Sequence, residues 1–266
     1  MKKYLKYMAG AGVFLILALV AVIGYFLPEP EGFPILEYHM VQKDTPKDAY
    51  AYNVPVEDFV EQLDYLEDNG YTTITIREFL RARKGLGELP EKPVILTFDD
   101  GYETNYTELL PILEARGMKA TVFMVANDIG KKDYMSWQQL KDMEKRGIEI
   151  GSHTANHLPL TQMPADKARE EARLSKLLME WNGMKTIYTL SYPNGKYTED
   201  MGRMLKEEEY LAAVTGDAGL NTFDTDPYQL QRINIPHPFF GINEFKWRLL
   251  KGRIFAWLGI WQHKAE

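Results

Sequence analysis

The sequence predicts an α/β fold built on a mainly parallel sheet, and three observations support this prediction. Segments with strand and helix patterns alternate along the chain at the spacing of βα units. The run from Pro93 to Phe98 is apolar or β-branched, as in a strand buried on both faces, and two carboxylates follow it. A chain of 266 residues with 45% hydrophobic content can bury a sizeable core. Roughly seven βα units in a single domain favour a barrel over an open sheet.

The first element is an apolar segment at residues 8–27, which contains no charged residue. Twenty such residues can span about 30 Å of hydrocarbon as a helix, so we expect a transmembrane segment. Lysines precede it and glutamates follow it, which places residues 1–7 in the cytoplasm and the remainder outside, at the cell membrane. A cleaved signal peptide is the alternative, but Ala21 and Gly24 make a poor cleavage site, so we favour an uncleaved, single-pass signal anchor.

Composition narrows the class of protein further. The net charge of −7 argues against a nucleic-acid partner, which normally meets a basic face. The chain has no cysteine, so an external domain would depend on its core and not on disulfides. Residues 28–32 (PEPEG) form a short, stiff linker before the folded domain begins.

The elements of the first half follow from periodicity. Residues 33–41 are predicted as a buried strand that presents His39, and residues 56–69 as an amphipathic helix that Gly70 ends. Residues 71–76 alternate as a strand does. After them we expect a short helix at 77–84, the central strand at 93–98, a helix at 104–116 and a strand at 120–126.

The second half continues the same alternation. We expect helices at 136–146, 164–182 and 198–208, and strands at 148–151, 186–192, 210–214 and 230–235. The character changes after Phe240, because residues 241–266 combine lysine and arginine with tryptophan and phenylalanine. A basic, aromatic helix of this kind can lie on a membrane surface or an anionic polymer, or it can pack on the barrel with its tryptophans in the core.

Two motifs at predicted strand ends carry the chemistry. Asp99 and Asp100 follow the central strand, and His153 and His157 follow the strand at 148–151. Neighbouring carboxylates repel each other, which a cation would relieve, and imidazole with carboxylate suits zinc and similar divalent ions. Asp100, His153 and His157 would supply three ligands and leave one position for water, as catalytic sites do. An Asp-Asp-Gly turn with a chance pair of histidines is the alternative.

A hydrolytic site also needs a base and an acid. Metal-bound water has a lowered pKa, and Asp99 beside the ligand Asp100 is placed to accept its remaining proton. Asp99 could instead cap the following helix. An amide substrate requires an acid to protonate the departing amine, and His39 and His237 are both candidates.

Together these motifs resemble the polysaccharide deacetylase family, carbohydrate esterase family four. The resemblance covers about residues 33–240, the expected catalytic domain, and rests on Thr97 to Gly101, His153 to His157 and Tyr192-Pro193-Asn194-Gly195. It implies a distorted (β/α) barrel of seven or eight strands, Asp99 as base, and Asp100, His153 and His157 as ligands of a divalent metal, with Zn²⁺ the expected ion. It also implies that the third motif lines the substrate groove, together with Tyr102, and gives a backbone N–H to the oxyanion.

The sequence departs from the family pattern in two places. An arginine expected ahead of the proline in the third motif is replaced by Leu190-Ser191-Tyr192, and Arg232 is a possible substitute that would orient Asp99. An ordinary surface arginine at a strand end is the alternative. The usual final motif of the family, leucine-x-histidine, is only approximated around His237. Residues 34–39 resemble the opening strand of the exported poly-N-acetylglucosamine deacetylases, and this resemblance implies that His39 is the acid. We therefore favour His39 over His237.

The expected function is a membrane-anchored, metal-dependent hydrolase that removes N-acetyl groups from an N-acetylglucosamine-containing polysaccharide or peptidoglycan outside the cytoplasmic membrane. An O-acetyl esterase on an envelope glycan is one alternative, since an ester needs a weaker leaving-group acid. A non-catalytic glycan-binding protein is another, although such a protein has no use for a base beside a metal. The sequence leaves the polymer, the metal and the oligomeric state open.

Overall fold

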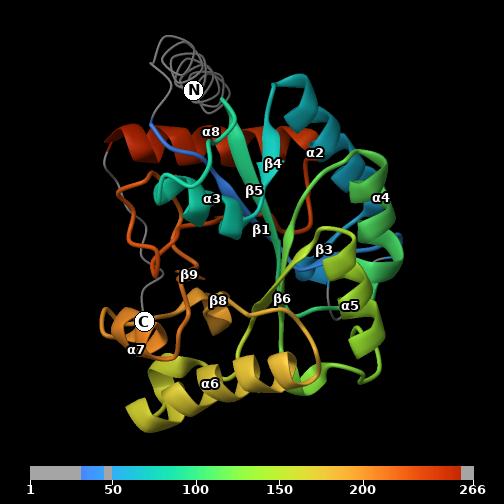
Figure 1. The fold of residues 1–266 in the computed structure, drawn as a ribbon. Helices are drawn as coiled ribbons and strands as arrows, with labels where there is room; N and C mark the ends of the chain where they lie inside the picture. The colour runs from blue at the N-terminus through green and yellow to red at the C-terminus, as the bar shows by residue number, and fades with distance from the viewer. Residues whose placement is uncertain (1–30, 45–49, 259–266) are drawn as a thin grey trace, which may run out of the picture.

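The computed structural model describes residues 31–44 and 50–258 (Figure 1). The predicted transmembrane segment at 8–27 and most of the linker therefore lie outside the described residues. Within the described part of the chain, every helix is too short or too polar to cross a bilayer. The fold of these residues is α/β with a parallel, curled sheet, which confirms the predicted class.

The sheet contains eight strands in parallel pairs, seven of which follow the order β10-β1-β5-β6-β7-β8-β9. β5 has β1 along one edge and both β4 and β6 along the other. β4 pairs with the first half of β5 and β6 with the second half. The strands are β1 (Ile35–Tyr38), β4 (Thr72–Ile74), β5 (Pro93–Phe98), β6 (Thr121–Met124), β7 (Glu149–Ser152), β8 (Thr189–Ser191), β9 (Ala212–Val214) and β10 (Ile233–Asn234).

The sheet curls so that its two edge strands approach each other, but regular strand pairing does not close it. A parallel bridge between Val214 and Leu230 joins the chain at the end of β9 to the segment just before β10. The stretch between these residues is irregular, so the predicted distorted barrel of seven or eight strands takes the form of a curled half-barrel. The consequence for the site is that residues just before β10 reach across to β5.

Helices pack against the convex face of the sheet and form the main core with it (Figure 1). A smaller cluster fills the concave side near the start of the strands and includes Ile35, Ile95, Phe123 and Val214. Side chains of a strand alternate between its faces, so β1, β5, β6 and β9 contribute to both clusters. The helices are α2 (Val56–Asp68), α3 (Ile76–Arg83), α4 (Leu110–Ala115), α5 (Trp137–Lys145), α6 (Ala165–Trp181), α7 (Met201–Glu207) and α8 (Ile242–Leu258), with short η1 (Tyr50–Tyr52), η2 (Asn105–Leu109), η3 (Ala126–Asp128), η4 (Leu160–Gln162) and η5 (Pro193–Gly195).

Most predicted elements are present, and the differences concern their ends. The strand predicted at 71–76 stops at Ile74, because Thr75 forms a capping box with Glu78 and begins α3. The helix predicted at 104–116 starts as a π-helical turn, η2, before α4. Two-residue strands β2 (Met40–Val41) and β3 (Asn53–Val54) pair in a small separate sheet that the sequence pattern did not predict.

The C-terminal helix α8 belongs to the folded domain, as one of the two alternatives considered for it expected. It packs on the body of the domain through Phe245, Leu249 and Gly252, which are buried, and a Cβ on Gly252 would clash with Ile233. The expectation that its tryptophans lie in the core is wrong for the two that the structure describes, since Trp247 is 46% and Trp257 51% exposed.

Candidate active site

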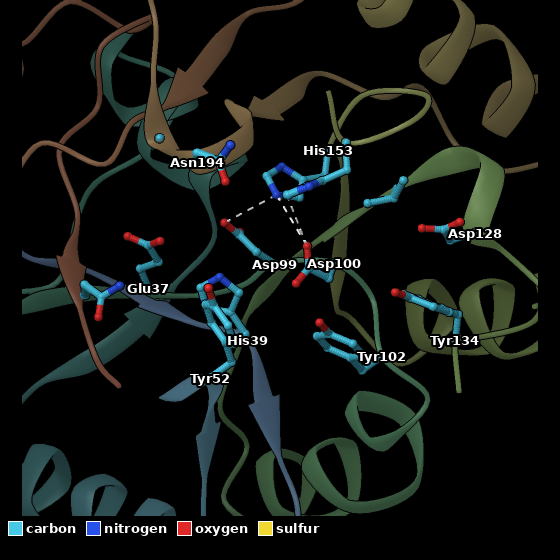
Figure 2. A pocket seen from close by; sticks show the side chains of 14 residues that line it. Glu37, His39, Tyr52, Asp99, Asp100, Tyr102, Asp128, Tyr134, His153 and Asn194 are labelled. Atoms are coloured by element: carbon cyan, nitrogen blue, oxygen red, sulfur yellow. Dashed lines mark ion pairs between the residues drawn. The ribbon is translucent and has the colours of Figure 1, made fainter. Parts of the chain in front are cut away.

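A pocket of about 400 Å³ lies at the C-terminal ends of the strands (Figure 2). Asp99 and Asp100 reach it from the end of β5, His153 from the end of β7, and His39 from just after β1. The strands are parallel, so their carboxyl ends meet at one side of the sheet, which is where ligands bind in such folds. The lining residues are Glu37, His39, Tyr52, Asp99, Asp100, Tyr102, Val125, Asp128, Tyr134, His153, His157, Asn194, Gly195 and Asn234.

The three predicted metal ligands lie together in this pocket. Asp100 Oδ1 is 3.6 Å from His153 Nε2 and 3.5 Å from His157 Nε2, and one ligand atom from each of the three residues falls within 4.8 Å of the others. Tetrahedral coordination with bonds near 2.1 Å would place ligand atoms about 3.4 Å apart. The donor set and its spacing therefore fit a divalent cation such as Zn²⁺, and Asp-His-His leaves one coordination position for water or substrate.

The surroundings prepare both histidines for this role. His153 is buried and its Nδ1 lies 2.8 Å from the Ser191 carbonyl oxygen, an arrangement in which Nδ1–H donates and Nε2 faces Asp100 as a free acceptor. Burial, together with the neighbouring His153, lowers the pKa of His157. Because metals bind the neutral imidazole, this shift favours the ligating form.

Asp99 is held by the side chain of Arg232, which the sequence only suggested as a partner. Arg232 Nη1 and Nη2 donate to the two carboxylate oxygens of Asp99 at 2.8 Å each, and Ser191 Oγ donates to Oδ2 at 3.0 Å. Arg232 is 1% exposed, so the alternative of a surface arginine is wrong. Its Nε donates to the Thr215 carbonyl, which fixes the fork geometry of the pair.

The charge state of Asp99 follows from these contacts. Burial alone would raise its pKa, but the positive charge of Arg232 and the proximity of His153 outweigh burial and hold the pKa well below the usual range. Asp99 is therefore ionised at neutral pH and can accept a proton. It is not a helix cap: the chain after it continues through Asp100 at φ 71° and Gly101 at φ 80° before η2 begins.

Glu37 is a second buried carboxylate on Arg232 and was not predicted as a site residue. Its Oε1 is 3.5 Å from Arg232 Nη2, and its Oε2 is buried without a hydrogen-bond partner. Glu37 and His39 are two residues apart, and both line the pocket. Residues two positions apart in a strand lie on the same face, so the sequence spacing of Glu37 and His39 could have identified Glu37 as a site residue.

The Glu37→Gln variant should retain its fold and lose part of its turnover. Without the second carboxylate, the full charge of Arg232 acts on Asp99, lowers the pKa of Asp99 further and makes it a weaker base. We expect turnover to fall about tenfold, which corresponds to one pKa unit in a strongly base-dependent step. The midpoint of thermal unfolding should change little, because glutamine keeps the shape of the side chain and Arg232 keeps Asp99 as its counter-ion. Unchanged turnover in a steady-state assay would leave Glu37 with a purely structural role.

The two candidate acids lie in different places. His39 lines the pocket, with its ring 5.1 Å from that of Tyr52. His237 does not line it: its Nδ1 lies 3.0 Å from the Asn53 carbonyl oxygen and its ring packs against Tyr50. Of the two histidines, only His39 is therefore placed to reach a substrate held beside Asp99.

The third motif contributes differently from the prediction. Tyr192 and Pro193 are buried and do not line the pocket, because Tyr192 continues β8 into the core and stacks on Tyr197. The backbone N–H groups of Tyr192 and Gly195 donate to the carbonyls of Val214 and Tyr192, so they cannot serve an oxyanion. Gly195 and Asn194, two residues of the motif that was expected to line the groove, do line the pocket. Because Pro193 has no N–H, Asn194 carries the remaining backbone N–H of the motif.

Tyr102, which was expected to line the substrate groove, lines the pocket. It stacks on Tyr134 with ring centroids 5.4 Å apart, and both rings line the pocket next to Asp128. Burial and the charge of Asp100 raise the pKa of Tyr102, so its phenol stays protonated and can donate a hydrogen bond. An aromatic wall with polar tips suits a sugar ring, which has both apolar faces and hydroxyl groups.

Backbone strain is concentrated around this pocket. Asp100, Thr154, His157 and Asn194 all have positive φ, between 56° and 71°, which few residues other than glycine adopt. Each such residue costs of the order of 1–3 kcal/mol and persists where the surroundings impose it. The metal ligands are therefore held in directions that the fold enforces.

A buried carboxylate held by arginine, beside three candidate ligands for a divalent cation, is an arrangement typical of metal-dependent hydrolases. The family model for polysaccharide deacetylases matches residues 86–213. The chain is 34% identical over 207 residues to YxkH of Bacillus subtilis, which carries the same family's name, covering 78% of this chain and 72% of the relative. It thus belongs to the polysaccharide deacetylase family, carbohydrate esterase family four, and is an enzyme of that family.

Two further relatives cover most of the chain. A poly-β-1,6-N-acetyl-D-glucosamine N-deacetylase from Staphylococcus epidermidis is 25% identical over 230 residues, covering 77% of this chain and 79% of the relative. The structure of the Streptococcus pyogenes deacetylase PplD in complex with acetate superposes with a TM-score of 0.75 at 27% identity, covering 84% of this chain and 99% of that one. Both matches cover a larger part of the chain than the 86–213 of the family model.

Proposed function

We propose that this protein removes N-acetyl groups from an N-acetylglucosamine-containing polysaccharide outside the cytoplasmic membrane, to which residues 8–27 anchor it. The observation that carries the proposal is the pairing of an ionised Asp99 with the Asp100-His153-His157 cluster in one pocket, with His39 on the same pocket wall as Glu37. The named activity of the Staphylococcus epidermidis relative supports an N-acetylglucosamine polymer as substrate. Lysines before the apolar segment and acids after it support the external location.

The residues divide the hydrolysis of the amide between them. A divalent cation on Asp100, His153 and His157 would polarise the acetyl carbonyl and lower the pKa of water. Asp99 accepts the proton that water loses as its oxygen attacks the carbonyl carbon. His39 donates a proton to the amine nitrogen as the carbon–nitrogen bond breaks, so acetate and a free amine leave. Asn194 lines the pocket, and its backbone N–H would donate to the carbonyl oxygen as negative charge develops there.

Acetate release together with metal content tests the proposal. We expect the full-length protein to bind about one divalent ion, the stoichiometry of a three-ligand catalytic site, and to release acetate from N-acetylglucosamine oligomers. Asp100→Ala and His153→Ala should lose both metal and turnover. Release only from sugars whose acetyl group is an ester would assign an esterase instead. Metal without release from either substrate would favour a glycan-binding protein, and absence of metal would contradict the ligand set.

A comparison of His39→Ala with His237→Ala tests the assignment of the acid. We expect the His39 variant to lose about 10²–10⁴-fold in turnover on an N-acetyl substrate, the usual contribution of a general acid. The loss should be much smaller on an aryl acetate, because a phenolate leaves without protonation. His237→Ala should keep near-normal turnover on both substrates. An unchanged ratio of amide to ester activity in the His39 variant would contradict its role as the acid.

A further inference from the structure

The C-terminal helix α8 has two apolar faces. Successive residues of an α-helix are about 100° apart, so Phe245, Leu249 and Gly252 share one side, which is buried on the domain. A second apolar stripe runs along the opposite side, where Trp247 is 46%, Trp257 51% and Leu258 50% exposed. Leu250 and Ile254 lie between them on this stripe and are partly exposed. Only the first face is accounted for by the fold.

Basic residues flank the second stripe. Lys246 and Arg253 lie along one side of it and Lys251 along the other, by the same helical spacing. Long cationic side chains beside an apolar stripe can place their stems on hydrocarbon and their charges at lipid headgroups. Trp247 and Trp257 are of the residue type enriched at membrane interfaces. This arrangement is typical of a helix that lies in the plane of an anionic bilayer surface.

The first residues of the folded domain lie next to α8. Gly32 and Pro34 line a cleft of about 200 Å³ together with Leu249 and Arg253 of α8. The five residues 28–32 can span at most about 18 Å when fully extended. If residues 8–27 cross the membrane, α8 is therefore held within about 18 Å of the bilayer surface.

The catalytic pocket lies at the other end of the strands. Pro93 at the start of β5 lines the same cleft as Leu249, whereas Asp99 follows the end of β5. Six residues of strand separate them by about 20 Å. Figure 1 likewise shows α8, in red, across one end of the molecule near the label of β4, with α6 at the opposite end.

We propose that the outer face of α8, formed by Trp247, Leu250, Ile254, Trp257 and Leu258, binds the anionic phospholipid surface of the membrane that carries the protein. This contact rests on the membrane anchor of the proposed function and adds a second attachment. Two attachments at one end of the domain restrict its rotation and point the catalytic pocket away from the bilayer. The substrate would then be an external polymer and not a lipid-linked sugar at the membrane surface.

Site-directed fluorescence in the full-length protein tests this contact. The chain has no cysteine, so Ile254→Cys accepts a single environment-sensitive fluorophore, and Leu174→Cys on α6, 47% exposed in the native chain, is the matched control. The protein is reconstituted in vesicles of phosphatidylcholine and phosphatidylglycerol. The emission of the label at 254 should shift to the blue. Lipids that carry a quencher at a shallow acyl position should remove more than about half of this emission, since interfacial helices lie about 5–10 Å deep. The label at 174 should do neither.

A charge on the stripe should weaken the contact without affecting the fold. Leu250→Glu in the chain labelled at 254 is expected to reverse the blue shift and most of the quenching, whereas Leu174→Glu should leave both unchanged. Turnover on soluble oligomers should be normal in both variants, because neither residue lies near the pocket.

The other outcomes overturn the proposal in distinguishable ways. If the protein floats with the vesicles but the label at 254 emits as it does in water, the α8 contact is refuted and the anchor is not. Protein that does not float would refute the anchor and the contact together. Quenching of the label by a second, quencher-carrying copy and not by lipid would assign this face to a dimer. Acetate release is measured separately, so none of these results bears on the catalytic proposal.

Discussion

Asp99→Asn is expected to abolish turnover while leaving the metal site intact. Asparagine keeps the shape of the side chain and can still accept from Arg232, but it cannot accept a proton from water. A lost general base costs about 10²–10⁴-fold, and we expect the upper part of this range because Asp99 is the carboxylate that the fold keeps ionised beside the ligands. Single-turnover acetate release and metal content on the same sample measure both properties.

Asp128→Asn is the matched control for this prediction. Asp128 lines the same pocket but pairs with Lys131 and belongs to neither the ligand cluster nor the Arg232 network. Its loss should reduce turnover by less than about tenfold, as expected for a residue that contacts substrate without taking part in proton transfer. If Asp99→Asn retained turnover comparable with that of Asp128→Asn, another group would have to be the base.

Arg232→Met is expected to have the largest effect on stability. The variant keeps most of the side-chain volume but leaves Asp99 and Glu37 buried without a counter-ion. Removing one partner of a buried pair costs about 3–5 kcal/mol, because the remaining charge stays desolvated. Arg169→Met is the control: Arg169 pairs with Glu207 and Glu208 but its side chain is 41% exposed, so its loss should cost far less than that of Arg232. Urea unfolding at pH 7 measures both.

The difference between wild type and Arg232→Met should depend on pH in a defined direction. In the wild type the lowered pKa of Asp99 contributes stability that is present above about pH 4, the usual range of a carboxyl, and is lost as the pH falls below it. In the variant burial raises the pKa of Asp99, so the variant loses stability as the pH rises through that raised value. The deficit should therefore be large at pH 7 and smaller near pH 4.5. A deficit independent of pH would indicate lost packing instead.

The metal site could be predicted from the sequence because each of its parts is local. Asp100 and the pair His153 and His157 directly follow strands whose patterns are clear, and parallel strands present their carboxyl ends on one side. Arg232 could be suggested but not distinguished from a surface residue. It lies 133 positions after Asp99, and its burial depends on the irregular segment after β9, which has no periodicity to read.

The third motif shows where resemblance in sequence was insufficient. Tyr192 and Pro193 were expected to line the groove, but the strand β8 carries Tyr192 into the core, and the turn presents Asn194 instead at φ 57°. Which residue of a turn faces a pocket depends on the backbone angles, and a shift of one residue turns the side chain to the other face. The outer face of α8 was similarly hard to assign, since two opposed apolar stripes cancel in any measure of amphipathicity.

The distance along the chain between Asp99 and Arg232 has a consequence for biosynthesis. Strands β1 to β9 can be complete on a chain that still lacks residue 232, and such an intermediate already contains Asp99 and Glu37 but no cation to neutralise them. We therefore expect chains truncated before residue 232 to be unstable, because burying an unpaired charge costs of the order of 3–5 kcal/mol. The same arginine that keeps Asp99 ionised thus makes stable folding depend on synthesis of the chain past residue 232.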